Sequence, residues 1–216
     1  PNVHVRRLVS EGTRPRLPWA QRLPAFQKDP RPVLSLLERL KDDPELYVRR
    51  SVANNLNDIG KDHPDVLAAT GARWLKGASA ERAWIVRHAL RSAIKRGDAA
   101  ALAVLDYAPS RSARIANADI TPERARIGGK VGIAFDVTNA GKSPLRLMVD
   151  FRIHYVKANG KTSAKTFKLT SLELSADETA HLSKSVSLKE MTTRKHYPGL
   201  HRVEAVLNGK VVDLGV

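Results

Sequence analysis

The stretch Tyr47-Val48-Arg49-Arg50-Ser51-Val52 decides the fold, because the chain contains its pattern three times. The other two copies are His4-Val5-Arg6-Arg7-Leu8-Val9 and Ile85-Val86-Arg87-His88-Ala89-Leu90. Successive copies are roughly 40 residues apart, and each lies in a segment with helical periodicity, which is typical of stacked helix pairs. Residues 1–108 are therefore predicted to form a HEAT-like α-helical repeat array.

The repeat predicts one concave face that is lined by equivalent positions of successive copies. In chain order these positions carry Arg7, Arg50 and His88, then one turn later Glu11, Asn54 and Ser92, and a turn further on Asp58. A basic concave surface that contains a carboxylate indicates a binding or catalytic site for a polyanion.

The helix expected behind Asp43-Pro44-Glu45 serves both core and surface. Asp43 is its predicted N-cap, Pro44 its first residue and Gly60 its stop. A core stripe consists of Val48, Val52, Leu56 and Ile59.

A polar row follows a neighbouring face of this helix, with Arg50, Asn54 and Asp58 at i, i+4 and i+8. Such rows are usually solvated edges, but the matching pair Arg7 and Glu11 in the first copy favours a functional row. Asn55 falls in the core stripe, and we interpret it as a structural clamp, because a buried asparagine must be hydrogen-bonded.

The pattern of apolar and polar residues changes after residues 109–118, a segment that is predicted to be a linker. Beyond it, apolar and polar residues alternate in about seven short stretches, among them residues 131–137 and 145–155, with Asn-Gly turn signals between some of them. Residues 119–216 are therefore predicted to form an immunoglobulin-like β-sandwich. The fold class is multidomain, α then β.

The charge of the chain points to a polyanionic partner. The formal net charge is +15 and the pI is about 10.4, with basic residues spread over both halves. Nucleic acid is the favoured partner. A generally basic proteome and a membrane surface are the alternatives.

Several classes of chemistry are excluded by what the sequence lacks. There is no cysteine, so neither disulfides nor cysteine-ligated zinc can form. The seven histidines show no metal-ligand spacing, and no P-loop, GxGxxG or nucleophile elbow occurs. We expect no cofactor, no metal, no membrane span and a cytoplasmic, nucleoid-associated location. Because the chain opens with Pro1 inside a repeat copy, we also expect an N-terminal truncation.

Trp19 follows a proline-containing loop that carries Arg14 and Arg16. Its indole either fills the gap between two helix pairs or lies on the surface, where it could pack on a base, a sugar or a cation. Trp74 and Trp84 lie in apolar helical patterns and are interpreted as core.

Two long motifs resemble the AlkC branch of the HEAT-like-repeat DNA glycosylases. They are Arg7 with Ser10-Glu11-Gly12-Thr13-Arg14-Pro15-Arg16-Leu17-Pro18-Trp19, and Ser51-Val52-Ala53-Asn54-Asn55-Leu56-Asn57-Asp58-Ile59. Many members of that branch carry an immunoglobulin-like tail. The resemblance implies excision of N3-alkylated bases, notably 3-methyladenine and 3-methylcytosine, from double-stranded DNA. It also implies an active-site carboxylate at Asp58, a second acid at Glu11, and Arg7 and Trp19 as their neighbours.

The implied chemistry suits a fixed carboxylate. An N3-alkylated adenine is already cationic, so it leaves as a neutral base without a general acid. A carboxylate can stabilise the deoxyribose as it becomes oxocarbenium-like and can position water.

Other polar residues are candidates for DNA contacts, which would be salt-dependent and largely independent of sequence. These are Arg14, Arg16, Arg49, Arg50, Asn54, Arg87, Arg91 and Lys95. Arg49 and Arg87 could instead be ion-pair partners within the repeats. The basic sandwich either clamps the duplex or is a passive appendage. A monomeric base-excision glycosylase is thus the leading interpretation, and a non-catalytic helical-repeat module that binds nucleic acid or protein is the alternative.

Overall fold

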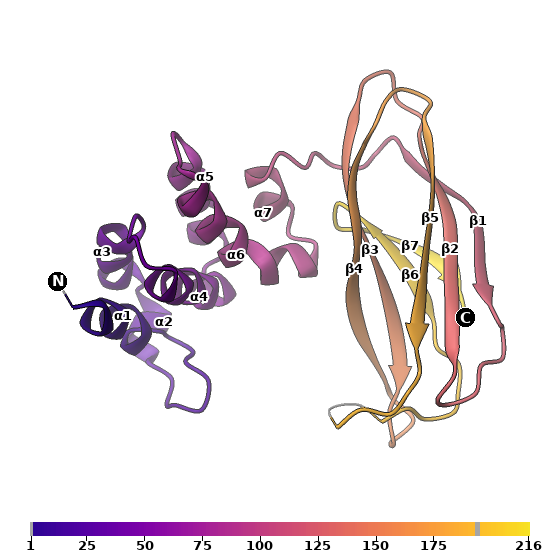
Figure 1. Cartoon of the computed structure of the whole chain (residues 1–216), viewed down its shortest axis with the longest axis horizontal. Helices are drawn as coiled ribbons and strands as arrows, with labels where there is room; N and C mark the ends of the chain where they lie inside the picture. The colour runs from indigo at the N-terminus through magenta and orange to yellow at the C-terminus, as the bar shows by residue number, and fades with distance from the viewer. Residues whose placement is uncertain (1, 193–194) are drawn as a thin grey trace. The chain divides into compact units, whose positions relative to one another are not determined.

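The computed structural model describes residues 2–192 and 195–216 (Figure 1). The chain divides into two compact units, Pro1–Leu105 and Asp106–Val216. The first unit is helical and the second consists of strands. This confirms the predicted fold class, α-helical repeats followed by an immunoglobulin-like sandwich.

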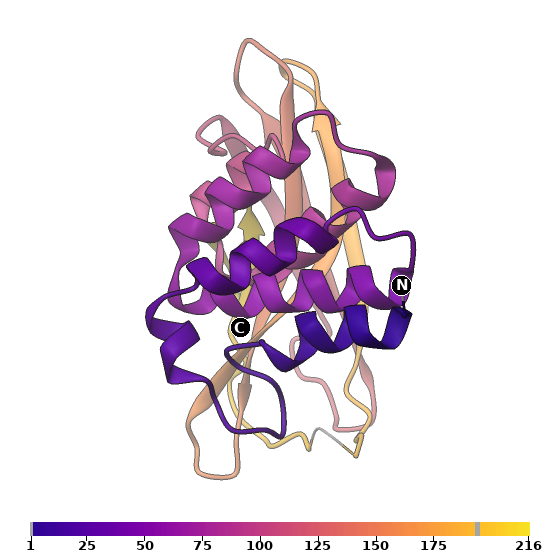
Figure 2. The same ribbon diagram turned by 90° about the vertical axis from the view of Figure 1, so that its left-hand side faces the viewer.

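Helices of the first unit run alongside one another (Figure 2). They are α1 (Val3–Gly12), α2 (Pro24–Lys28), α3 (Arg31–Leu40), α4 (Leu46–Asp62), α5 (Pro64–Leu75), α6 (Ala80–Arg96) and α7 (Ala99–Val104). The three helices that contain the repeated motif lie next to each other, because α4 packs against both α1 and α6. Helices α3, α5 and α7 back them. This is the layered arrangement that the repeat predicts.

The core of the helical unit follows the predicted apolar stripe. Val48, Val52 and Leu56 are fully buried, and Ile59 is 1% exposed. Trp74 is 1% exposed and its indole N–H donates to Glu38 at 2.8 Å, so its interpretation as a core residue is confirmed.

Both predicted ends of α4 are wrong. The helix begins at Leu46 rather than Pro44, because the Asp43 carboxylate accepts the backbone N–H of Glu45 at 3.0 Å in a turn that precedes the helix. It also continues through Gly60 to Asp62. A Cβ at Gly60 would lie 2.3 Å from Cδ2 of Leu67 on α5, so this glycine permits close helix packing instead of stopping the helix.

The second unit is a sandwich of two antiparallel sheets. One sheet has the order β1-β2-β5 and the other β4-β3-β6-β7. The strands are β1 (Ala113–Thr121), β2 (Lys130–Asn139), β3 (Leu145–Val156), β4 (Thr162–Leu174), β5 (Thr179–Ser187), β6 (Val203–Leu207) and β7 (Lys210–Gly215).

The sandwich core contains Phe135, Leu147 and Phe151, each at most 1% exposed. Strand β1 begins within the 109–118 segment, which the sequence predicts to be a linker. Ser110 is buried there and donates to the carbonyl of Leu207 at 2.7 Å, so this segment is part of the sandwich unit. No helix in the described part of the chain is long and apolar enough to cross a bilayer.

Candidate functional site

Asp58 lies on α4 and is only 1% exposed, and both of its carboxylate oxygens are engaged. Its Oδ2 accepts from Nε of Arg14 at 2.8 Å, and Nη2 of Arg14 lies equally close. Its Oδ1 accepts from Nζ of Lys61 at 2.7 Å. The carboxylate is therefore neither a helix cap nor open to solvent. It is held in one orientation between two cations.

Glu11 at the end of α1 extends the same cluster. Its Oε1 accepts from Nη1 of Arg14 at 2.8 Å, and its Oε2 accepts from the Ser51 hydroxyl at 2.7 Å. Burial raises the pKa of Glu11, but the hydrogen bonds from Ser51 and Arg14 outweigh burial and hold that pKa below its ordinary value. Glu11 is therefore ionised at neutral pH.

Arg14 joins the two carboxylates, one from each helix. Burial lowers the pKa of its guanidinium, but hydrogen bonds to Asp58 and Glu11 raise it by more. Arg14 is 8% exposed, so its predicted contact with DNA phosphate does not fit the structure. It positions the carboxylates instead.

Arg7 completes the α1 side of the cluster, one helical turn before Glu11. Its Nη2 lies 3.6 Å from Oε2 of Glu11, and its guanidinium lies over the ring of Tyr47, 4.5 Å from the centroid. The structure therefore brings three of the four predicted catalytic residues, Arg7, Glu11 and Asp58, into one network through Arg14.

Trp19 is on the surface, which shows that the gap-filling interpretation is wrong. Its exposed fraction is 106%, and its φ of 63° is a left-handed conformation that bulky residues rarely adopt. The loop closes through hydrogen bonds from the N–H of Ala20 to the carbonyl of Leu17 and from the N–H of Leu23 to that of Pro15. The left-handed backbone of an exposed, bulky residue makes Trp19 a candidate for binding, because strained conformations cluster at functional sites.

A cavity of about 340 Å³ lies beside this indole. It is lined by residues 16–20, Arg22 and Lys61. Because Lys61 also holds Asp58, the cavity is adjacent to the carboxylate cluster.

A second polar connection joins α4 to α6. Nη2 of Arg91 donates to Oδ1 of Asn54 at 2.9 Å, and Nη1 of Arg91 donates to the carbonyl of His88. Burial, together with the positive charges of Arg91 and Arg50, lowers the pKa of His88. Burial also lowers the pKa of Arg91 itself. Asn54 and Arg91 therefore tie two helices together, which limits their availability for the predicted DNA contacts.

The remaining cations divide into engaged and exposed groups. Nε of Arg16 pairs with Oδ2 of Asp62 at 2.8 Å. Arg49 donates to the carbonyls of Asp43 and Pro44, so it stabilises the turn before α4, and its phosphate contact stays a prediction. Side chains that are exposed, as a DNA contact requires, are Arg50, Arg87 and Lys95.

Sequence reasoning missed Ser51, Arg22 and Lys61. The i, i+3 spacing of Asp58 and Lys61 was a signal that could have identified the pair. No local pattern could have identified Ser51, whose partner Glu11 is on another helix. The described residues include no group of three or more histidine and acidic side chains that could hold a metal ion.

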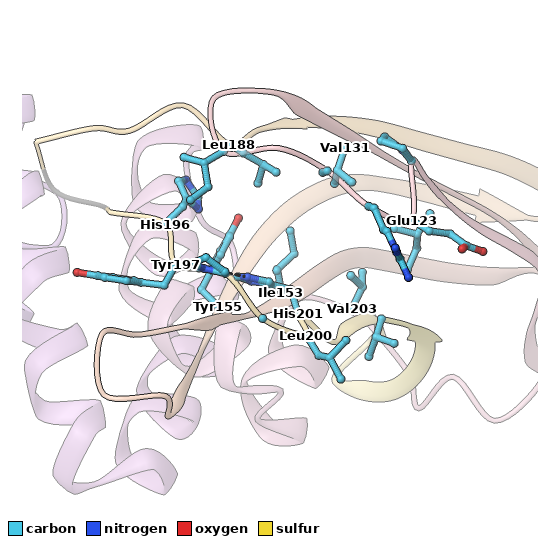
Figure 3. A pocket seen from close by; sticks show the side chains of 18 residues that line it. Glu123, Val131, Ile153, Tyr155, Leu188, His196, Tyr197, Leu200, His201 and Val203 are labelled. Atoms are coloured by element: carbon cyan, nitrogen blue, oxygen red, sulfur yellow. Dashed lines mark hydrogen bonds between the residues drawn. The ribbon is translucent and has the colours of Figure 1, made fainter.

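The sandwich unit has its own cavity of about 340 Å³ at one end of the two sheets (Figure 3). Its lining is mainly apolar and includes Ile153, Leu188 and Val203. The ring of Tyr155 lies edge-on to His196 and His201, and Nε2 of His201 is 3.1 Å from the carbonyl of Tyr197. Among the described residues that line this cavity, Glu123 supplies the acidic side chain.

The chain thus combines a HEAT-like helical array that carries a carboxylate cluster with an immunoglobulin-like sandwich. Residues 114–215 match the family described as "Uncharacterised protein YhaZ, C-terminal Ig-like domain". The whole chain is 42% identical over 212 residues to the "Uncharacterized protein YhaZ" of Bacillus subtilis (strain 168), a match that covers 98% of this chain and 58% of that protein.

The chain is also similar to a solved structure, that of Pseudomonas fluorescens alkylpurine DNA glycosylase AlkC bound to DNA containing an abasic site analog. The two are 43% identical with a TM-score of 0.91, and the match covers 97% of this chain and 58% of AlkC. These findings confirm the resemblance to the AlkC-type glycosylases. The chain thus spans somewhat over half the length of each relative.

Proposed function

We propose that this chain carries the catalytic carboxylate of a DNA glycosylase that acts on N3-alkylated bases in double-stranded DNA. The observation that supports this most directly is the network of Asp58, Arg14 and Glu11 beside an exposed indole and a basic cavity. The similarity to a structure titled as an alkylpurine DNA glycosylase bound to DNA supports the same reaction class.

In the proposed reaction, 3-methyladenine leaves as a neutral base and 3-methylcytosine is a second substrate. Asp58 stabilises the positive charge that develops on the deoxyribose and positions the attacking water. Arg14 fixes the orientation of the carboxylate, so no reorganisation is needed at the moment of reaction. Glu11 shares Arg14 with Asp58 and keeps the guanidinium in place.

Trp19 packs on the exposed face of the lesion or its sugar, where the π-face of an indole favours a cation. Arg50, Arg87 and Lys95 contact backbone phosphates, because they are the members of the predicted set that are exposed. The protein acts as a monomer on chromosomal DNA in the cytoplasm.

The experiment is incubation with N-methylated duplex DNA, followed by chromatographic detection of freed base. Asp58→Asn should lower the rate of 3-methyladenine release by ~10²–10³-fold, the usual cost of losing one preorganised electrostatic group. Lys76→Met removes an exposed charge at the end of α5 and serves as the control. AlkC of P. fluorescens serves as the positive control for the substrate.

Equal release by wild type and Asp58→Asn would reject the assignment of Asp58. A non-catalytic nucleic-acid-binding module is the second candidate, because Asp58 is buried and both of its oxygens are engaged. DNA binding without base release, while AlkC releases base in parallel, would favour that module.

A further inference from the structure

The cavity beside Trp19 has the chemistry of an anion site. Three cations, Arg16, Arg22 and Lys61, line its wall, and none of the described residues that line it is a carboxylate. Arg16 forms an ion pair with Asp62, which neutralises its charge. Arg22 is exposed and has no ion-pair partner within the described ranges, while the Lys61 side chain is 39% exposed. The cavity therefore presents positive charge that the protein itself does not fully neutralise.

Lys61 belongs to both the cavity and the carboxylate cluster. Its Nζ lies 2.7 Å from Oδ1 of Asp58, three residues earlier on α4. A lysine ammonium is a compact charge on a flexible four-carbon stem, so it can exchange one anionic partner for another with little reorganisation.

Asp58 does not depend on Lys61 for its position. Arg14 holds Oδ2 through both Nε and Nη2, and the Arg14 side chain is only 9% exposed. If Lys61 withdraws, the carboxylate keeps its orientation and a cationic partner, and only Oδ1 becomes vacant.

We propose that the cavity is a phosphodiester site, and that Lys61 moves from Asp58 to a DNA backbone phosphate when the duplex binds. Arg22 supplies the second cation at that phosphate. The exchange vacates Oδ1 of Asp58 at the moment when a sugar arrives that will become cationic. The inference rests on the proposed partner, double-stranded DNA, and deepens the proposed function by adding the step that unmasks the carboxylate.

The physical reason for the exchange is charge. A lysine that stayed on Oδ1 would neutralise the carboxylate and repel the oxocarbenium-like sugar, which carries the same sign of charge. While Oδ1 is vacant, Arg14 still compensates the charge of the buried carboxylate, and the oxocarbenium-like sugar supplies the second positive charge in the transition state.

The first test is the salt dependence of binding to undamaged duplex DNA. Each phosphate contact contributes about 0.9 to the slope of log K against log salt concentration. The double variant Lys61→Met/Arg22→Met removes both cations from this one phosphate, so it should reduce the magnitude of the slope by about 0.9, whereas Lys76→Met should leave it unchanged. A slope for the double variant equal to that of wild type would overturn the site.

The second test is a double-mutant cycle between Asp58 and Lys61. In wild type, binding must draw Lys61 away from Asp58. The loss of that ion pair partly offsets the gain from the phosphate contact, so Lys61→Met weakens binding by a smaller factor. In an Asp58→Asn background the lysine is already released, so Lys61→Met should weaken DNA binding by a larger factor. An equal factor in both backgrounds, after circular dichroism has shown that each variant is folded, would overturn the exchange.

Both tests measure binding to undamaged DNA, so their result is separate from that of the base-release assay. If the slopes and the cycle behave as expected but no base is released, the phosphate site stands and the catalytic assignment fails. If base is released but the slope of the double variant equals that of wild type and Lys61→Met has the same effect in both backgrounds, the glycosylase assignment stands and the exchange fails.

Discussion

Nε of Arg14 donates to Oδ2 of Asp58 at 2.8 Å, across 44 residues of sequence, and this contact joins the segment after α1 to α4. The same guanidinium donates to Glu11. One buried cation therefore determines how two acidic side chains from different helices are placed.

Removing Arg14 should destabilise the helical unit strongly. Arg14→Met would leave Asp58 buried with Lys61 as its single cationic partner, and breaking a buried pair typically costs ~3–5 kcal/mol. Urea denaturation should show this loss in the free energy of unfolding. Arg39→Met, which removes an exposed charge on α3, should change that free energy by less than about 0.5 kcal/mol. A similar small effect for Arg14→Met would contradict the structural role of the bridge.

Replacing Trp19 should separate binding from stability. Trp19→Ala removes a side chain that buries no surface, so the free energy of unfolding should change by less than about 0.5 kcal/mol. DNA binding should weaken by ~1–3 kcal/mol, the usual effect of losing an aromatic stacking surface. Trp74→Ala is the matched control, since this buried indole should cost ~3–5 kcal/mol of stability. Unchanged DNA affinity in Trp19→Ala would remove the indole from the proposed interface.

Glu38 should make stability depend on pH in the acid range. Burial raises its pKa, but hydrogen bonds from Lys41, Trp74 and Arg73 outweigh burial and lower that pKa from 4.5 to about 2. A carboxyl group with a depressed pKa stabilises the fold above its unfolded pKa, and the contribution disappears as pH falls towards the folded value.

Glu38→Gln should therefore be less stable than wild type by about 1 kcal/mol at pH 7, because the site is partly exposed. The difference should shrink below about pH 4.5 and vanish near pH 2. Thermal unfolding of both proteins over this range measures it. A difference that stays constant with pH would show that the carboxylate charge is not responsible.

His88 should titrate below its ordinary pKa of 6.5. Burial disfavours the imidazolium, and the charges of Arg91 and Arg50 disfavour it further. NMR titration should therefore give a midpoint below 6.5, and Arg50→Met should raise it, whereas Arg39→Met should not. Because the folded pKa is depressed, His88 stabilises the fold above its unfolded pKa, and this contribution decreases as pH falls below about 6.5. An unchanged midpoint in Arg50→Met would rule out the influence of that arginine.

The repeated motif was sufficient to predict which helices are equivalent and which residues face the core. Val48, Val52 and Leu56 are buried as their spacing indicates. Asn55 is the predicted clamp, and its Nδ2 donates to the carbonyl of Ser10 at 2.7 Å. These features follow from which face of α4 each residue lies on, and the spacing of residues along the helix determines that face.

Pairing between side chains on different helices was not predictable in the same way. The basic loop after α1 predicts a phosphate contact for Arg14, yet its partner is Asp58 on α4. Whether a surface-like arginine becomes buried depends on how the helices stack, which sequence spacing does not specify. Sequence spacing does not specify the exposure of Trp19 for the same reason.

The carboxylate cluster lies between α1 with its following loop and α4. Asn55 on α4 stabilises this interface, because its Nδ2 donates to the carbonyl of Ser10 and to the hydroxyl of Thr13. A fluctuation that lifts α1 and its following loop away from α4 would therefore strip Asp58 of its guanidinium, separate Ser51 from Glu11 and detach the indole-bearing loop in one event. We therefore expect the site to open and close as one cooperative unit. Amide exchange in α1 should thus report directly on the fraction of molecules competent for their task.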